Sequence, residues 1–196
     1  MTITAKIDAT TRIPGAYRAE IIPAPRSVKI ELTAACDFKC FFCATGQNLR
    51  PKGHMDWLLY TRLAREIRES GVEELGLFYL GESMLYKLLP EAIEYAKKDL
   101  GFPYVFLTTN GYRATADKLR ACFEAGLDSL KFSFNAASPA QTVAVTQVDA
   151  FDRQVANIKA ARVTRDQTWK ETGHRCGLYA SSIQYDGEQQ ARMEQA

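Results

Sequence analysis

The sequence lacks a long hydrophobic run and an excess of charge of either sign. No apolar stretch approaches the roughly 20 residues that a bilayer-spanning helix needs, so no membrane span is expected. The 25 Lys and Arg residues nearly balance the 23 Asp and Glu residues, which leaves a net charge of +2. There is no long basic run, so electrostatics do not indicate a nucleic-acid partner. Residues 1–6 also lack the apolar segment of a signal peptide.

Cysteine and histidine are scarce, at five and two residues. An odd number of cysteines, three of them within eight residues, does not suit a secreted disulfide framework. We therefore expect a cytoplasmic protein in a reducing environment. The remaining composition, 46% hydrophobic and 24% charged over 196 residues, is typical of one globular domain.

The distribution of prolines and of apolar patterns along the chain predicts two regions. Residues 1–25 contain three of the seven prolines and are predicted to form an extended arm. Residues 26–196 are predicted to form a single core domain. The chain stops abruptly after a helical pattern at 188–196, so we expect it to be a fragment that is incomplete at its C-terminus.

Apolar strands alternate with helical patterns through the core domain. Because strand–helix units that repeat in this way form right-handed crossovers, they predict an α/β fold with a parallel sheet. A closed eight-strand barrel needs about 250 residues, so five units indicate an open sheet or a partial (βα) barrel. The predicted strands are 28–33, 75–80, 104–109, 129–134 and 177–184, and the predicted helices are 56–70, 86–99, 114–125 and 150–164.

Two helices carry more detailed predictions. Asp56 is placed to cap the first helix, whose residues Leu59, Leu63 and Ile67 recur at a spacing that predicts a buried stripe. The helix at 150–164 is predicted to have Phe151, Val155 and Ile158 on one face.

Three cysteines form a C-x3-C-x2-C motif at Cys36, Cys40 and Cys43. They follow the strand at 28–33, on the loop at its carboxyl end, where parallel α/β folds place their chemistry. Clustered thiolates are soft ligands that suit iron–sulfur clusters or zinc. A four-iron cluster usually takes four cysteines, so three local ones would leave one iron open. The alternative is a zinc site with His54 as the fourth ligand.

The cysteine spacing, with the aromatic Phe42 just before the last cysteine, resembles the cluster motif of the radical S-adenosylmethionine (radical SAM) superfamily. The resemblance covers about residues 28–185 and implies a partial barrel. It also implies a 4Fe–4S cluster on the three cysteines, whose open iron binds S-adenosylmethionine. An electron donor such as a flavodoxin or ferredoxin would reduce the cluster. Cleavage of S-adenosylmethionine would then give a 5′-deoxyadenosyl radical that abstracts a substrate hydrogen.

The same resemblance implies contacts to S-adenosylmethionine. Gly81-Glu82 matches part of the family's Gly-Gly-Glu-Pro, where the glycine permits close backbone approach and the carboxylate offers acceptors to the amino group. Leu80 and Ser83 depart from that pattern. The other implied contacts are Phe42, Ser133, Asn135 and Ser181, with Ser182 and Gln184 as weaker candidates.

Each of these positions also has a purely structural interpretation. Gly81-Glu82 can be a tight turn, and Ser133 and Asn135 can cap the end of a strand. The stretch 108–111 resembles a family motif, but its Asn-Gly is equally explained as a left-handed turn, so no role is assigned to it. Thr146-Gln147 occupies a region where many family members carry an arginine.

The substrate is not determined by these motifs. Residues 151–159 resemble the segment seen in members with a C-terminal SPASM domain, which modify peptides or proteins, and this predicts a peptide substrate. A small-molecule enzyme of cofactor biosynthesis is the alternative. Two further alternatives involve no catalysis. One is a zinc- or cluster-binding module, and the other is an inactive fragment that binds the cluster.

Overall fold

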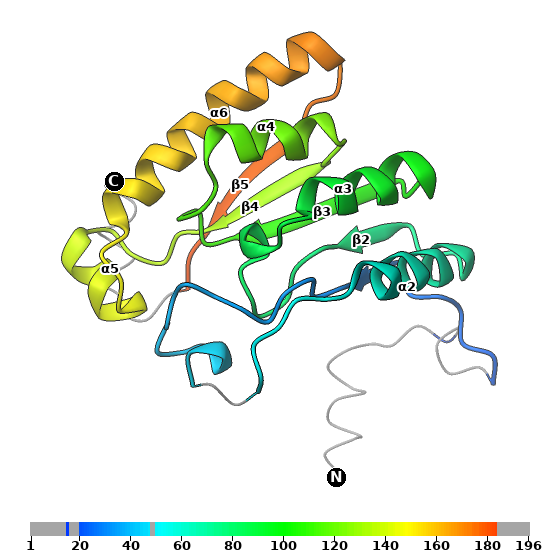
Figure 1. Cartoon of the computed structure of the whole chain (residues 1–196), viewed down its shortest axis with the longest axis horizontal. Coiled ribbons are helices and arrows are strands. Elements are labelled where there is room, and N and C mark those ends of the chain that lie inside the picture. Colours follow the sequence, from blue (N-terminus) through cyan, green and yellow to red (C-terminus); the bar gives the residue numbers. More distant parts are fainter. Residues whose placement is uncertain (1–14, 16–19, 48–49, 184–196) are drawn as a thin grey trace.

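A computed structural model of the chain describes residues 15, 20–47 and 50–183, and these form one five-stranded sheet (Figure 1). The strand order β1-β2-β3-β4-β5 follows the chain, and every neighbouring pair is parallel. This confirms the predicted α/β fold with five strands. The strands are β1 (Ser27–Lys29), β2 (Glu74–Gly76), β3 (Tyr104–Thr109), β4 (Ser129–Ser133) and β5 (Gly177–Ser181).

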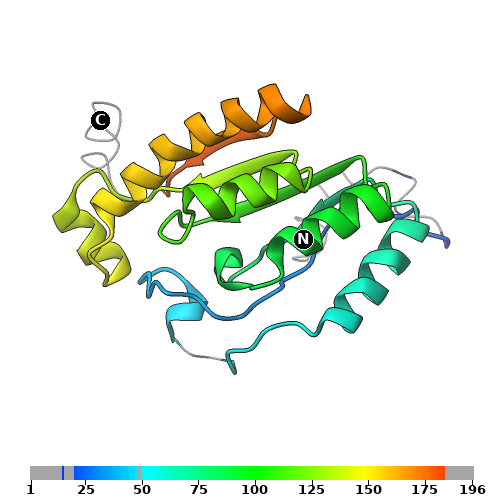
Figure 2. The same ribbon diagram turned by 45° about the horizontal axis from the view of Figure 1, so that its top comes forward.

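The main helices lie on one face of the sheet (Figures 1 and 2). They are the crossovers of a parallel sheet, as the alternating pattern predicts. These helices are α2 (Trp57–Glu69), α3 (Leu89–Glu94), α4 (Ala116–Glu124) and α6 (Phe151–Thr172). The short α5 (Pro139–Thr146) lies instead at the end of the sheet where the strands finish, beside the cysteine loop (Figure 1).

The hydrophobic core lies between the sheet and these helices. Val105 and Leu107 of β3 and Leu130 and Phe132 of β4 are all at most 2% exposed. Successive side chains of a strand point to opposite faces, so the residues between them point to the inner face of the curved sheet. Lys131 on that face is exposed. The inner face therefore remains accessible in the described part of the chain.

Several element bounds differ from the predicted ones. The strands β1 and β2 are short because their ladder continues only to the bonds from Ile30 N to Gly76 O at 2.8 Å and from Leu77 N to Phe106 O at 3.0 Å. The helix predicted at 86–99 begins at Leu89 and ends in a π-helical turn, Tyr95–Asp99. The helix α5 was not predicted, and α6 continues to Thr172 instead of ending near 164.

The first helix shows one correct and one partly correct detail. Asp56 caps α2, since its side chain accepts from the amides of Leu58 and Leu59. The predicted stripe is only partly correct: Leu63 and Ile67 pack half-buried against the core, but Leu59 is 39% exposed and the fully buried residues are Tyr60 and Ala64.

Parts of the predicted arm and the predicted terminal helix fall outside the described residues. The arm was predicted at 1–25, of which only residue 15 and residues 20–25 are described, and the helix at 188–196 is not described. Within the described ranges, no helix is both long and apolar enough to cross a membrane.

Candidate active site

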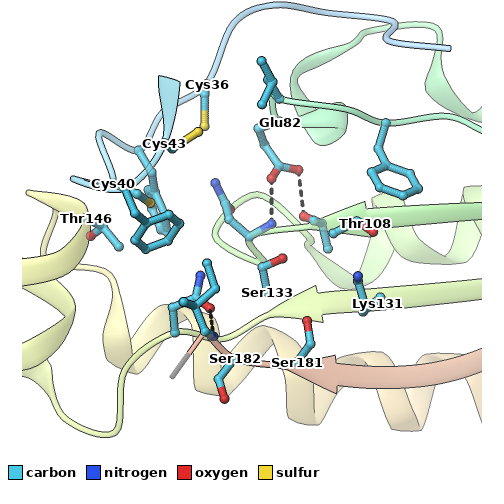
Figure 3. Close-up of a pocket in the computed structure, with 18 of the residues that line it drawn as sticks. Cys36, Cys40, Cys43, Glu82, Thr108, Lys131, Ser133, Thr146, Ser181 and Ser182 are labelled. Atoms are coloured by element: carbon cyan, nitrogen blue, oxygen red, sulfur yellow. Dashed lines mark hydrogen bonds between the residues drawn. The ribbon is translucent and has the colours of Figure 1, made fainter. Parts of the chain in front are cut away.

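A cavity of about 340 Å³ lies at the carboxyl ends of the strands, and the cysteine loop forms one of its walls (Figure 3). This is the edge of a parallel sheet where ligands bind most often. All nine residues predicted as cluster ligands or main cofactor contacts line it, and so does the weaker candidate Ser182. The nine are Cys36, Cys40, Phe42, Cys43, Gly81, Glu82, Ser133, Asn135 and Ser181. The fold thus brings together residues from the cysteine loop, the loop after β2 and the ends of β4 and β5, which are up to 145 positions apart in the chain (from Cys36 to Ser181).

The cysteine loop is held in place by backbone hydrogen bonds to α5. Lys39 N donates to Thr146 O at 2.9 Å, and Phe41 N donates to Val145 O at 3.1 Å. On the other side of the loop, Thr45 Oγ1 donates to Leu80 O at 3.2 Å. The unpredicted helix α5 therefore supports the motif between its first and last cysteine.

The donor set on this loop suits a soft metal group. Burial raises the pKa of Cys36 to about 12 and that of Cys40 to about 11, while negative neighbours act in the same direction. Without a metal these thiols are protonated, and binding of iron or zinc would release the protons. In the described ranges no three Cys, His, Asp or Glu side chains converge on one ion.

His54, the fourth ligand of the alternative zinc site, is engaged elsewhere. Its backbone pairs with Thr33 in an isolated bridge, and its ring centroid lies 6.3 Å from that of Tyr86. It is not among the residues that line the cavity. The three cysteines accordingly share a wall with polar strand ends and not with His54.

Gly81 allows the loop after β2 to pack directly on the cysteine loop. A Cβ atom at this position would lie 1.9 Å from Thr33 O, far inside van der Waals contact. The neighbouring amide, Glu82 N, donates to Ala35 O at 2.8 Å. The close backbone approach expected at Gly81 is therefore observed between two loops of the protein itself.

Glu31 holds the loop after β2 in place, a role that was not recognised in the sequence. Its Oε1 accepts from the amides of Leu80 and Gly81, both at 2.9 Å, and its carboxylate pairs with Arg50 at 2.6 Å. Burial raises the pKa of Glu31, but the bonds from Arg50 and the two amides outweigh burial and hold it below the usual value. The alternating pattern of the first strand gave no signal for this role.

Glu82 is a buried carboxylate, only 3% exposed. It accepts from Met84 N at 2.9 Å, from Thr109 Oγ1 at 2.7 Å and from Asn110 N at 2.7 Å. Burial raises the pKa of Glu82 to about 7, even though these hydrogen bonds lower it, and the charge of Asp37 raises it further. A carboxylate has about four acceptor positions, so roughly one remains for a ligand.

Asn110 connects three elements around the cavity, although the sequence gave it no role. Its Nδ2 donates to Asp37 Oδ1 at 2.8 Å, within the cysteine motif. Its carbonyl accepts from Gln154 Nε2 of α6 at 2.6 Å. Asp37 also pairs with Arg113 at 3.1 Å. The family-like stretch 108–111 was the one available signal for this residue.

The ends of β4 and β5 supply the remaining polar wall. Ser133 and Ser181 are register partners on adjacent parallel strands. Asn135 Oδ1 accepts from Ile183 N at 3.1 Å, which ties the two strand ends together. Thr146 occupies the region where many members of the resembled family carry an arginine. It lines the cavity, and its hydroxyl donates to Thr142 O at 2.8 Å. Gln184, a weaker candidate, lies outside the described residues.

Comparisons with known proteins identify the family and the fold of the chain. A family model described as "Radical SAM superfamily" matches residues 30–166. A "Probable GTP 3′,8-cyclase" of Saccharolobus solfataricus is 37% identical over 140 residues, which are 68% of this chain and 42% of that protein. A "GTP 3′,8-cyclase" of Tolumonas auensis is 30% identical over 138 residues, 69% of this chain and 40% of that protein. The chain thus spans about two fifths of the length of these relatives.

The fold also matches solved structures. SuiB of Streptococcus suis, bound to S-adenosylmethionine, superposes with a TM-score of 0.67 at 20% identity, over 97% of this chain and 40% of that one. The same protein bound to its precursor peptide SuiA gives a TM-score of 0.65. At this identity the likeness concerns the fold, which is the predicted partial (βα) barrel.

Proposed function

The chain belongs to the Radical SAM superfamily, and from this we propose that it is the core of an enzyme that holds a 4Fe–4S cluster on Cys36, Cys40 and Cys43. The observation that carries the proposal is the cavity shared by these cysteines and the polar ends of β2, β4 and β5. When bound, the cluster and S-adenosylmethionine supply one chemistry: one electron cleaves the cofactor to methionine and a 5′-deoxyadenosyl radical, which takes a hydrogen atom from the substrate.

Three thiolates on one loop leave a fourth metal position without a ligand from this chain. The other two cysteines, Cys122 and Cys176, are 0% and 1% exposed and belong to the hydrophobic core. Their burial in that core supports a cluster with three protein ligands and an iron open to the cofactor.

The polar residues of the cavity are suited to hold S-adenosylmethionine. The remaining acceptor position of Glu82 is assigned to the cofactor's ammonium group. Ser133, Asn135 and Ser181 offer hydroxyl and amide groups to its carboxylate or ribose. Phe42, next to the third cysteine and 38% exposed, is assigned to border the adenine.

For the substrate we favour a small molecule of cofactor biosynthesis over a peptide. The relatives with 30–37% identity are named GTP 3′,8-cyclases, and they are matched over more than two thirds of this chain. The peptide-bound neighbour shares 20% identity, which supports the fold alone. The physiological reductant is proposed to be a flavodoxin or ferredoxin of the cytoplasm, and residues 26–196 are proposed to be one domain.

The test is formation of 5′-deoxyadenosine. The protein is reconstituted anaerobically with iron and sulfide, mixed with S-adenosylmethionine and dithionite, and the products are separated by chromatography. We expect 5′-deoxyadenosine from the wild type and none from Cys40→Ala. Cys122→Ala is the matched control, because it removes a thiol outside the motif.

The outcomes separate the alternatives. Loss of the product in Cys40→Ala but not in Cys122→Ala supports the radical reaction. A cluster that changes its spectrum with S-adenosylmethionine but yields no product indicates a binding-only core. Colourless protein with one zinc and no acid-labile sulfide would overturn the proposal in favour of a zinc module.

A further inference from the structure

One positive charge in the cavity has no function in the cofactor chemistry described above. Lys131, in the middle of β4, lines the cavity on its inner-face side. Figure 3 shows it across the pocket from the three cysteines. It precedes Ser133 by two residues on the same face, and so lies about 7 Å further from the cysteine end.

The neighbours of Lys131 on the sheet are polar on one side and aromatic on the other. Thr108 of β3 and Tyr179 of β5 are its register partners, so all three point to the inner face. Thr108 also lines the cavity, as does Phe78, whose ring lies 5.5 Å from that of Phe106. A cavity lined by a cation, a hydroxyl and an aromatic ring is suited to an anionic ligand with an apolar part.

The charge of Lys131 is not neutralised within the described part of the chain, where no ion pair or hydrogen bond involves it. Among the described residues, Glu82 is the one carboxylate that lines the cavity, and it already accepts from three donors, one in its own segment and two at the end of β3. Glu31 is paired with Arg50. Lys29 of β1 places its amine 5.1 Å from the centre of the Phe78 ring.

We propose that Lys131 is a substrate-binding residue that receives a negatively charged group, a phosphate or a carboxylate, of the molecule attacked by the radical. This inference rests on the proposed function, because it takes the cavity beyond the cofactor contacts to be the substrate site. The anion would lie deeper in the barrel than Ser133, which leaves the carbon to be attacked between it and the cofactor. Lys131 thereby selects anionic substrates and orients them.

Binding of simple anions tests this without requiring the natural substrate. Reconstituted protein is saturated with S-adenosylmethionine, so that the cofactor's own contacts are filled. Pyrophosphate and succinate are then titrated by calorimetry at fixed ionic strength into the wild type, Lys131→Met and Lys131→Arg. Lys170→Met, which removes an exposed charge from the last turn of α6, is the control.

We expect the wild type and Lys170→Met to bind at least one probe, and Lys131→Met to bind it roughly tenfold or more weakly. Lys131→Arg should retain most of the affinity. Pyrophosphate alone indicates a phosphate-bearing substrate, and succinate alone a carboxylate-bearing one. Equal iron content in all variants shows that the site is intact.

The inference is overturned if the wild type binds neither probe, if Lys131→Met binds as well as the wild type, or if Lys170→Met weakens binding equally. Its failure is distinguishable from failure of the proposed function. Cys40-dependent 5′-deoxyadenosine without anion binding would overturn only the role of Lys131. Anion binding through Lys131 without any 5′-deoxyadenosine would overturn the radical chemistry and leave Lys131 as an anion-binding residue of the cavity.

Discussion

Gly81 and Glu82 act first on the protein's own backbone. Gly81 lets two loops touch, and Glu82 joins the loop after β2 to Thr109 and Asn110 at the end of β3. The sequence identified both residues through their likeness to a family motif. It did not reveal that they assemble the walls of the cavity as well as facing it.

Gly81→Ala should destabilise the protein by about 1–3 kcal/mol or more, because the added Cβ would lie 1.9 Å from a rigid backbone oxygen. Urea denaturation measures the loss. Gly53→Ala is the control, since a Cβ there meets nothing within 4 Å, and its free energy of unfolding should change by less than about 0.5 kcal/mol. Equal effects of the two substitutions would contradict the close packing of the two loops.

Glu82 should make the stability of the cluster-free protein depend on pH. Its pKa is about 7 in the folded protein, against 4.5 for an ordinary glutamate. Between these values the folded state binds more protons than the unfolded state, so the free energy of unfolding falls as the pH rises from about 4.5 to 7. The contribution of one group is roughly 3 kcal/mol at most.

The measurement is urea denaturation of wild type and Glu82→Gln at a series of pH values from 5 to 8. We expect the difference between the two proteins to change through this window, because the glutamine does not titrate. A constant difference across the window would show that Glu82 does not carry the shifted pKa.

At the scale of elements, α6 shows why hydrophobic periodicity gave an incomplete picture. Its most buried side chains are not the predicted apolar ones but Gln154, Ala161, Thr164 and Thr168. The turn after β3 presents carbonyls to this helix, and Gln154 donates to one of them at 2.6 Å. Gln154 is polar at this buried position because the carbonyl of Asn110 requires a donor.

Gln154→Met, which keeps the length of the side chain but removes the donor, should cost about 1–3 kcal/mol of stability because Asn110 O loses its partner. Chemical denaturation is again the measurement. Lys159→Met, on an exposed position of the same helix, is the matched control and should be close to neutral. A neutral Gln154→Met would mean that water replaces the lost donor.

At the scale of the whole molecule, the sheet separates two environments. Its helix-covered face holds the hydrophobic core, whereas its inner face and carboxyl end hold the cavity and the three cysteines. The cysteine loop is hydrogen-bonded to α5 and to the loop after β2. A group bound to all three thiols would therefore hold the cysteine loop in place against these two segments. Ligands that bind only the folded state stabilise it.

Loading the protein with iron and sulfide should therefore slow hydrogen exchange in the cysteine loop, residues 36–47, and raise the midpoint of thermal unfolding. Mass spectrometry of reconstituted and chelator-treated protein measures the exchange. Peptides from α2 provide the internal reference, because that helix does not line the cavity. Identical exchange of residues 36–47 with and without iron would mean that the loop does not hold the cluster.

The sequence by itself determined the parallel α/β class, the bounds of β3, the cap at Asp56, and the cysteine motif on a loop after the first strand. These features depend on local patterns of two or three residues, or on spacing along a single segment. A one-dimensional pattern is sufficient where neighbours in the chain are also neighbours in space.

Only the tertiary structure decided the rest. The support of the cysteine loop by α5, the contacts of Glu31, and the central position of Asn110 join residues that lie tens of positions apart. The environment of Lys131 is of the same kind, because β3 and β5 supply its neighbours. Such contacts depend on which strand ends meet at one edge of the sheet, and that is fixed by packing and not by any local pattern.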